Sequence, residues 1–153
     1  MNPNFKIVPE AVVIGKVDSR AAALERLAHI FSGAYGLSYD LVLERLEERE
    51  ALGSTGFVRG VAIPHARVPE VKRPSVAVLR PLQPVEFDSA DGMPVTLVFG
   101  LLSPDNAGVT HLHALAAISR LVRDDTIREA LQMAPDEAAL FALINNATDR
   151  DAA

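Results

Sequence analysis

The most apolar stretch of the chain is Pro94-Val95-Thr96-Leu97-Val98-Phe99-Gly100-Leu101-Leu102. A strand that is covered on both faces is apolar at nearly every position, so the run 95–102 predicts a buried strand rather than an edge strand. The run is too short to span a bilayer, which takes roughly 18 apolar residues. The fold is therefore expected to be organised around this strand.

Other strands are expected on the N-terminal side of this run. Residues 11–17, 57–63 and 75–79 are short segments of β-forming composition. The connection 81–93 contains several turn-forming residues and has room for a short strand at 85–87.

Helices are expected at both ends of the chain. Asp18-Ser19 can cap a helix whose apolar stripe ends near Gly33 and Gly36, and Ser38 can start a second helix that ends before Gly53. The last third is helical, with shorter helices at 125–133 and 136–146 after a longer one. The evidence for two of these helices is a stripe of residues that is expected to face the core. The stripe consists of Leu24, Leu27, Ala28 and Phe31 in the first helix, and of Leu112, Leu115, Ala116, Ser119 and Val122 in the long one.

This order of elements predicts the fold class. Strands bracketed by helices favour a layered α/β domain, with helices on both faces of one sheet. A length of 153 residues suits a single domain over 1–153.

Composition excludes several classes of protein. Apolar residues make up 49% and charged residues 23%, which is typical of a globular protein, and the absence of cysteine excludes disulfides and thiolate sites. The net charge of −5 argues against nucleic acid as a partner, and no stretch predicts membrane insertion or a signal peptide, so the expected compartment is the cytoplasm. Residues 45–80 nevertheless carry seven basic against four acidic side chains, which fits either ordinary scatter or a segment that handles an anion.

The segment Gly60-Val61-Ala62-Ile63-Pro64-His65-Ala66-Arg67 carries the strongest chemical signal. Pro64 restricts Ile63 to extended geometry, so His65 leaves the predicted strand in a defined direction. A neutral imidazole has a free nitrogen lone pair near pH 7 and can accept a phosphoryl group. A histidine that only bonds the backbone is the simpler interpretation of His65 if the surrounding motif is ignored.

Three residues near the end of the second predicted helix could meet a phosphoryl group. Arg49 offers a permanent charge and a planar fork of donors. Ser54 and Thr55 lie between glycines and are candidates for contact with phosphoryl oxygens, although such a pair is most often a turn.

Thr110-His111-Leu112-His113 provides two further histidines. Positions i and i+2 of a helix point to opposite sides, so the pair does not predict a metal chelate, and no cofactor or metal is expected. If Thr110 caps the helix, His111 lies in the first turn, where an anion is favoured. One of the two histidines could then hydrogen bond a phosphorylated His65.

Taken together, these motifs are similar to a known family. Arg49-Glu50-Ala51-Leu52-Gly53-Ser54-Thr55-Gly56, followed by Gly60 to His65, resembles the active-site block of the fructose/mannitol-type enzyme IIA of the bacterial phosphotransferase system. The segments 84–88, 91–95 and 110–113 also resemble that family, and the similarity covers most of the chain, with a core of about 13–146.

The resemblance implies a mixed sheet between helices and a role for each candidate residue. It implies that His65 is the phosphorylated histidine, that His111 is a second active-site histidine, and that Arg49 stands beside them. The resemblance is closest to the nitrogen-related branch. Two segments depart from that branch: Phe57-Val58-Arg59 is bulkier than expected, and Ala66-Arg67 replaces Gly-Lys, which bears on partner choice more than on chemistry.

The resemblance leaves three functions open. The leading one is a phosphoryl carrier that is charged on His65 by a histidine phosphocarrier protein (HPr/NPr-like) and regulates targets such as ion transporters or sensor kinases. The alternatives are a sugar-specific IIA component that passes phosphate to a IIB domain, and an interaction module that kept the fold without the chemistry.

Overall fold

The computed structural model describes residues 4–57 and 59–152. In chain order the elements are η1 (Pro9–Ala11), β1 (Val12–Gly15), α1 (Arg20–Tyr35), α2 (Tyr39–Ala51), β2 (Val61–Ala62), β3 (His65–Arg67), β4 (Ser75–Pro81), β5 (Leu97–Ser103), α3 (Val109–Arg123), α4 (Asp125–Met133) and α5 (Glu137–Ala152).

One mixed sheet organises the described residues. The strand order is β1-β4-β5-β2, and β3 also pairs with β5. All pairs are parallel except β4 with β5. The apolar run at 95–102 is therefore the interior strand β5 (Leu97–Ser103), as its composition predicts, and every residue of β5 is buried.

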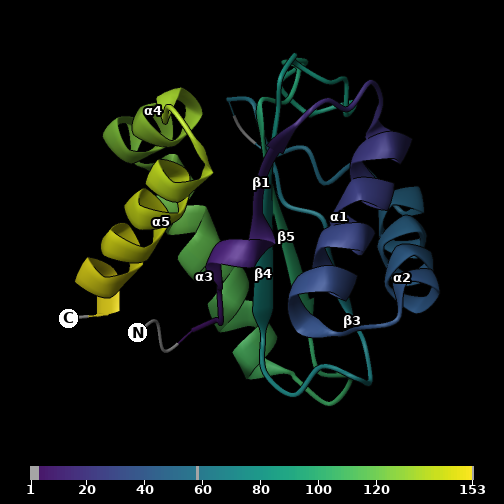
Figure 1. Ribbon diagram of the computed structural model, residues 1–153. Coiled ribbons are helices and arrows are strands. Elements are labelled where there is room, and N and C mark those ends of the chain that lie inside the picture. The colour runs from purple at the N-terminus through teal and green to yellow at the C-terminus, as the bar shows by residue number, and fades with distance from the viewer. Residues whose placement is uncertain (1–3, 58, 153) are drawn as a thin grey trace.

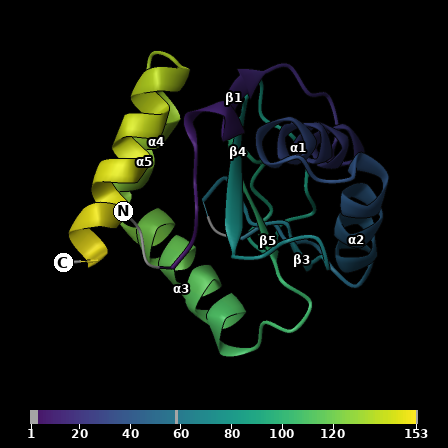
Figure 2. The same ribbon diagram turned by 60° about the horizontal axis from the view of Figure 1, so that its bottom comes forward.

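Helices cover both faces of the sheet. Figure 1 shows α1 and α2 on one side and α3, α4 and α5 on the other, and Figure 2 shows the same three layers from another direction. Alternate residues of the central strands feed two cores: Ala77 and Leu79 pack toward α1 and α2, whereas Val76 and Val78 pack toward the other three helices. The predicted fold class, a mixed sheet sandwiched between helices, is confirmed.

The first two helices begin where the sequence predicts. The Ser19 side chain accepts a hydrogen bond from the backbone N–H of Ala22, and the Ser38 side chain accepts one from that of Leu41. Gly36 ends α1 in the left-handed conformation, with φ of 70°. The expectation that Gly33 also breaks this helix is wrong, because the glycine lies inside α1 at a position with open space around it.

Two predicted strands are shorter than expected. In the predicted strand 57–63 only Val61–Ala62 forms a ladder, and Val58 lies outside the described residues. Within 85–87 the pairing is a single bridge between Val85 and Val95. Both segments border turns, so neighbouring strands offer them few ladder partners.

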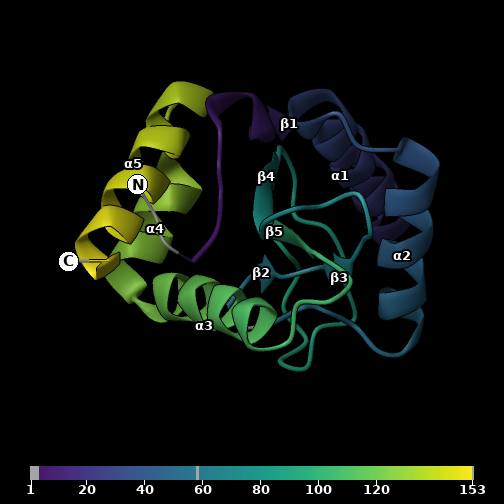
Figure 3. The same cartoon turned by 90° about the horizontal axis from the view of Figure 1, so that it is seen from below.

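The buried face of α3 differs from the predicted stripe. Leu112 is 61% exposed, and the residues that pack into the core are His111, Ala114, Ala117, Ile118, Leu121 and Val122. The predicted stripe is therefore rotated by about one residue from the real one, and of its members only Val122 is buried. In the view of Figure 3, α3 runs past the short strand β2, whose Val61 packs in the same core as this helix.

The C-terminal helices extend the predicted pattern. α4 has the predicted bounds, and α5 continues past residue 146 to Ala152. Across the described part of the chain, the helices fall short of the length and apolar character that a bilayer-spanning helix requires.

Candidate functional site

His65 lies at an interruption of the sheet edge rather than after the end of a strand. β2 and β3 pair with successive parts of β5, and Ile63-Pro64 separates them, so His65 is the first residue of β3. Nδ1 of His65 lies 2.7 Å from the carbonyl oxygen of Ile63. The half-buried imidazole is therefore anchored through one nitrogen, and the other nitrogen, Nε2, is turned away from the backbone.

Arg49 reaches His65 from the last turn of α2. Its Nε donates to Nε2 of His65 at 3.3 Å, and one Nη donates to the carbonyl oxygen of Gly53 at 2.9 Å. A guanidinium group has only donors, so Nε2 must be the accepting nitrogen. The neutral tautomer with its proton on Nδ1 satisfies both contacts and leaves the Nε2 lone pair as the reactive position.

His111 approaches His65 from the first turn of α3. The ring centroids of the two histidines are 5.7 Å apart and the rings are tilted by 48°. Nδ1 of His111 lies 2.6 Å from the hydroxyl oxygen of Ser103, the last residue of β5, and the histidine is 4% exposed. The residue before the helix is Gly108 rather than Thr110, which corrects the expected cap and still leaves His111 in the first turn.

Both imidazoles are held in the neutral form. Burial lowers the pKa of His65, with a further lowering by the Arg49 guanidinium, while the Ile63 carbonyl acts in the opposite direction. Burial also lowers the pKa of His111 to about 4, helped by the positive charge of Arg67. A neutral imidazole is the nucleophilic form, so the nitrogen lone pair is available at neutral pH.

Ser54 and Thr55 border the same site, but their hydroxyl groups already have protein partners. The Ser54 hydroxyl donates to the carbonyl oxygen of Phe87. The Thr55 hydroxyl donates to Oε1 of Glu50 at 2.5 Å, and its backbone N–H donates to Oε2 at 2.9 Å. Contact of either hydroxyl with a phosphoryl group would have to replace or share these bonds.

Two hollows meet at His65. One has a volume of about 260 Å³, is lined on one side by residues 54–57 and is closed by Leu115 and Ser119. The other, of about 490 Å³, runs past Arg45, Arg67 and His111 toward Leu112. Arg49, His65 and Leu115 line both hollows. A group attached to Nε2 would therefore lie between the 54–57 loop, helix α3 and the arginines of the larger hollow.

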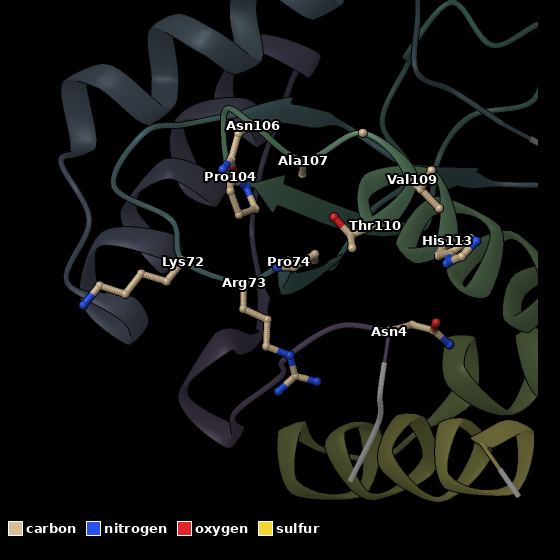
Figure 4. A pocket seen from close by; sticks show the side chains of 11 residues that line it. Asn4, Lys72, Arg73, Pro74, Pro104, Asn106, Ala107, Val109, Thr110 and His113 are labelled. Atoms are coloured by element: carbon tan, nitrogen blue, oxygen red, sulfur yellow. The ribbon is translucent and has the colours of Figure 1, made fainter.

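A cavity of about 470 Å³ lies elsewhere, between the start of α3 and residues 72–74 (Figure 4). His113 lines this cavity, which places it away from the His65 site on a different side of α3 from His111. None of the five predicted site residues lines it. The predicted site residues therefore gather at the two hollows beside His65 and not at this cavity, and of the two candidate histidines, His111 is the one beside His65.

Metal ligation has little support in this arrangement. Within residues 4–57 and 59–152, three or more histidine, aspartate or glutamate side chains do not come together in a geometry that would hold a metal ion. The two histidines of the site instead have an arginine and a backbone carbonyl as neighbours. This set of groups suits an anion better than a cation.

Two residues of the site were missed by sequence reasoning. Glu50 is buried behind Thr55, and Ser103 is the buried partner of His111. A signal for Glu50 was present, because Val42 and Leu46 mark a buried stripe and one more step of four residues reaches Glu50. Ser103 directly follows the apolar run, and pairing it with His111 required the three-dimensional fold.

Known proteins match most of the length of this chain. The family model described as "Phosphoenolpyruvate-dependent sugar phosphotransferase system, EIIA 2" matches residues 7–147. A protein of Bradyrhizobium diazoefficiens named "Nitrogen regulatory protein" is 40% identical over 139 residues, which cover 90% of this chain and 91% of that protein.

Solved structures show the same relationship. The crystal structure of nitrogen regulatory protein IIA-Ntr from Neisseria meningitidis superposes with a TM-score of 0.83 at 36% identity, covering 90% of this chain and 94% of the other. The crystal structure of IIA mannitol from Escherichia coli superposes with a TM-score of 0.75 over 91% of this chain and 99% of the other. At 21% identity the second comparison shows the shared fold alone.

Proposed function

The chain belongs to the phosphoenolpyruvate-dependent sugar phosphotransferase system EIIA 2 family, and on this premise we propose that it carries a phosphoryl group on Nε2 of His65. The observation that carries the proposal is the arrangement of the two ring nitrogens. Nδ1 is anchored on the Ile63 carbonyl, while Nε2 faces a cationic guanidinium and two hollows.

The geometry supports a simple transfer step. The Nε2 lone pair attacks the phosphorus atom of a donor phosphohistidine, a bond forms between Nε2 and phosphorus, and the donor nitrogen leaves with the electron pair of the broken bond. The proton stays on Nδ1, which donates it in a hydrogen bond to the Ile63 carbonyl, so the step needs no general base. The protein has only to position the group and neutralise its charge, as in other phosphoryl transfers.

Arg49 and His111 supply that neutralisation in the proposal. Arg49 exchanges its contact with Nε2 for phosphoryl oxygens when the new bond forms, because its fork of donors fits two oxygens at once. His111 contributes a neutral N–H rather than a second positive charge, since its pKa is lowered to about 4. Ser54 and Thr55 serve mainly to fix the wall of the hollow.

The surface around the site suits a protein donor. Leu52 and Leu112 line the larger hollow, and their side chains are 85% and 61% exposed. Large apolar side chains that lie exposed together can mark a surface that binds another protein. Arg45 and Arg67 flank them. An apolar patch with basic neighbours fits a partner that presents a phosphorylated histidine within a complementary surface, and we assign this partner to the histidine phosphocarrier (HPr/NPr-like) class.

We place the chain in the nitrogen-related branch, where the phosphorylation state regulates protein targets. The support is the 36–40% identity to proteins named for nitrogen regulation, over nine-tenths of the chain. The second candidate, a sugar-specific IIA component that passes phosphate to a IIB domain, is supported by the sugar phosphotransferase name of the whole family.

One experiment tests the transfer itself. The purified protein is incubated with phosphoenolpyruvate and the general phosphotransferase components, and intact mass is measured before and after acid treatment. We expect one phosphoryl group per chain, lost in acid and stable in base. A chain that gains none, beside a related IIA protein that is labelled in the same reaction, would refute the proposal and favour an interaction module.

A second experiment separates the two candidate branches. The phosphorylated protein is mixed with purified IIB domains of fructose and mannitol type, and transfer is followed by the mass of each partner. The nitrogen-related assignment predicts that the phosphoryl group stays on this chain, whereas rapid transfer to a IIB domain would support the sugar-specific function.

A further inference from the structure

Glu50 is a buried charged residue that the transfer step does not use. It lies in the last turn of α2, next to Arg49 in sequence, and is 7% exposed. Burying a carboxylate is costly unless hydrogen bonds and a counter-charge compensate. Its position directly behind the His65 site therefore calls for a reason.

The carboxylate of Glu50 is compensated mainly by Thr55. The Thr55 hydroxyl and backbone N–H donate to the two carboxylate oxygens at 2.5 Å and 2.9 Å. A guanidinium nitrogen of Arg20 lies 3.7 Å from Oε2. The same arginine donates to the carbonyl oxygen of Phe87 at 3.3 Å, so Glu50 and its partners join α1, α2 and the 87–88 segment.

A chain of hydrogen bonds leads from Glu50 to His65. Glu50 accepts both donors of Thr55, and the Thr55 carbonyl accepts the backbone N–H of Ile63 at 2.9 Å. The Ile63 carbonyl in turn accepts from Nδ1 of His65 at 2.7 Å. Each link fixes the group that makes the next one, so the orientation of the imidazole depends on the position of Thr55.

The loop fixed by Glu50 also holds Arg49. One Nη of Arg49 donates to the carbonyl oxygen of Gly53, two residues before Thr55. On the other side of Thr55, Gly56 lies against Ser89, where a Cβ atom would come within 2.9 Å of the Ser89 Cα and closer still to its side chain. The loop of residues 53–56 is therefore fixed at one end by Arg49 and at the other by its packing against Ser89, and Glu50 bonds Thr55 between them.

We propose that Glu50 is a positioning residue for phosphoryl transfer, which orients His65 through Thr55 and Ile63 and holds the loop that bears on Arg49. This inference rests on the proposed function of His65. Glu50 touches neither the phosphoryl group nor Nε2, and it acts through the two intervening residues.

The charge of Glu50 provides a readout that a purely structural residue would not change. The charged or titratable groups that face His65 are Arg49 and Glu50 from α2, Arg67 from β3 and His111 from α3. Of these, Glu50 raises the pKa of His65, and the two arginines lower it. Loss of the Glu50 charge therefore lowers the pKa of His65.

The substitution Glu50→Gln separates the charge from the geometry. A glutamine oxygen can accept a hydrogen bond from the Thr55 backbone N–H, as the carboxylate does. Its amide N–H can donate to the Thr55 hydroxyl, so this second hydrogen bond is kept with its direction reversed. Glu47→Gln is the matched control, because Glu47 is an exposed residue of the same helix. We expect a lower pKa of His65 in Glu50→Gln by NMR titration, an unchanged one in Glu47→Gln, and transfer about tenfold slower in Glu50→Gln alone.

A second pair of variants tests the hydrogen-bond chain. Thr55→Val removes the hydroxyl at nearly constant volume, and Thr55→Ser keeps it, so we expect Thr55→Val to transfer several-fold more slowly than Thr55→Ser. A folded Glu50→Gln with the wild-type His65 pKa and transfer rate would overturn the inference, as would equal rates for the two Thr55 variants. If wild-type protein accepts no phosphate, the proposed function fails, while the NMR titration still decides whether Glu50 acts on His65.

Discussion

The two histidines of the site, His65 at the start of β3 and His111 in the first turn of α3, have different surroundings. In His65 a backbone carbonyl fixes Nδ1, and Nε2 faces Arg49 and two hollows. In His111 a side-chain hydroxyl contacts Nδ1, and the ring is buried against the core. This difference supports the proposal that His65 forms the bond to phosphorus, while the buried His111 donates a hydrogen bond beside it.

Removing each histidine in turn tests this contrast most directly. We expect His65→Ala to abolish acid-labile labelling, because the nucleophilic nitrogen is gone. His111→Ala should still be labelled, but about tenfold more slowly, because one hydrogen bond to the phosphoryl group is lost. Labelling is measured by intact mass over time, with circular dichroism to verify folding.

His113→Ala is the matched control for this pair. His113 lines the separate cavity of Figure 4, so its removal should leave the labelling rate unchanged. Persistent labelling of His65→Ala would refute the site assignment. A slow His113→Ala beside a normal His111→Ala would show that the wrong histidine of the pair was chosen.

The sequence predicted which histidines and arginine lie together at the site better than it predicted the residues that support them. The block from Arg49 to His65 has a recognisable order, so Arg49 and His65 could be named, and the apolar run gave the interior strand. Glu50 was passed over because acidic residues at helix surfaces are common, and only burial distinguishes it from Glu47 and Glu48. Burial of a charge depends on partners such as Thr55 and Arg20, which the chain brings together only on folding.

The helix α3 shows why the facing of a helix is hard to predict. Two of its leucines, Leu112 and Leu115, form an apolar stripe beside a second stripe, which is built from smaller residues and from Ile118 and Leu121. The second stripe packs into the core, and it includes His111 because Ser103 satisfies the buried ring. Leu112 is left exposed on the other stripe, where it forms part of the proposed partner surface.

Arg49→Lys tests the geometry on the His65 side. Lysine keeps the positive charge but cannot reach Nε2 of His65 and the Gly53 carbonyl from a planar fork. A charge-assisted hydrogen bond contributes about 1.5–3 kcal/mol. Its loss should slow transfer by roughly ten- to a hundredfold, at about 1.4 kcal/mol per decade.

The measurement is the rate of phosphoryl acceptance at saturating donor, after circular dichroism has shown a folded variant. Arg80→Lys is a useful control, because Arg80 is an arginine outside this site that donates to the Leu131 carbonyl. If Arg49→Lys accepted phosphate at the wild-type rate, a bidentate role for Arg49 would be excluded.

The pH dependence of stability tests the His111 side. The pKa of His111 is lowered to about 4 in the folded chain, against an ordinary value of 6.5. Below pH 6.5 the unfolded chain therefore binds a proton that the folded chain does not, and stability falls as the pH falls toward 4. At pH 5 this one group should cost about 2 kcal/mol of unfolding free energy relative to pH 7.5.

Urea denaturation at both pH values measures this cost. In His111→Gln the group cannot titrate, so the loss between pH 7.5 and pH 5 should be smaller by about 2 kcal/mol than in wild type. Equal losses in wild type and His111→Gln would mean that the buried ring is protonated more easily than its surroundings indicate.

Ser103→Ala has the smallest expected effect and tests how His111 is prepared for its role. The buried Ser103 hydroxyl can donate to Nδ1 of His111 or accept from it. If it donates, the proton of the neutral ring lies on Nε2, which can then donate to a phosphoryl oxygen; if it accepts, a lone pair on Nε2 would repel that oxygen. We expect the first arrangement, so removing the hydroxyl loses the preference for the useful tautomer, at about 1 kcal/mol. Transfer should then slow about fivefold, by the same conversion of free energy to rate.

Ser75→Ala is the matched control, because Ser75 is a buried serine of the neighbouring strand β4 whose hydroxyl donates to the Arg73 carbonyl. Nitrogen chemical shifts of the His111 ring report the tautomer directly. A wild-type transfer rate in Ser103→Ala, together with an unchanged tautomer, would show that the helix turn alone selects the form of His111.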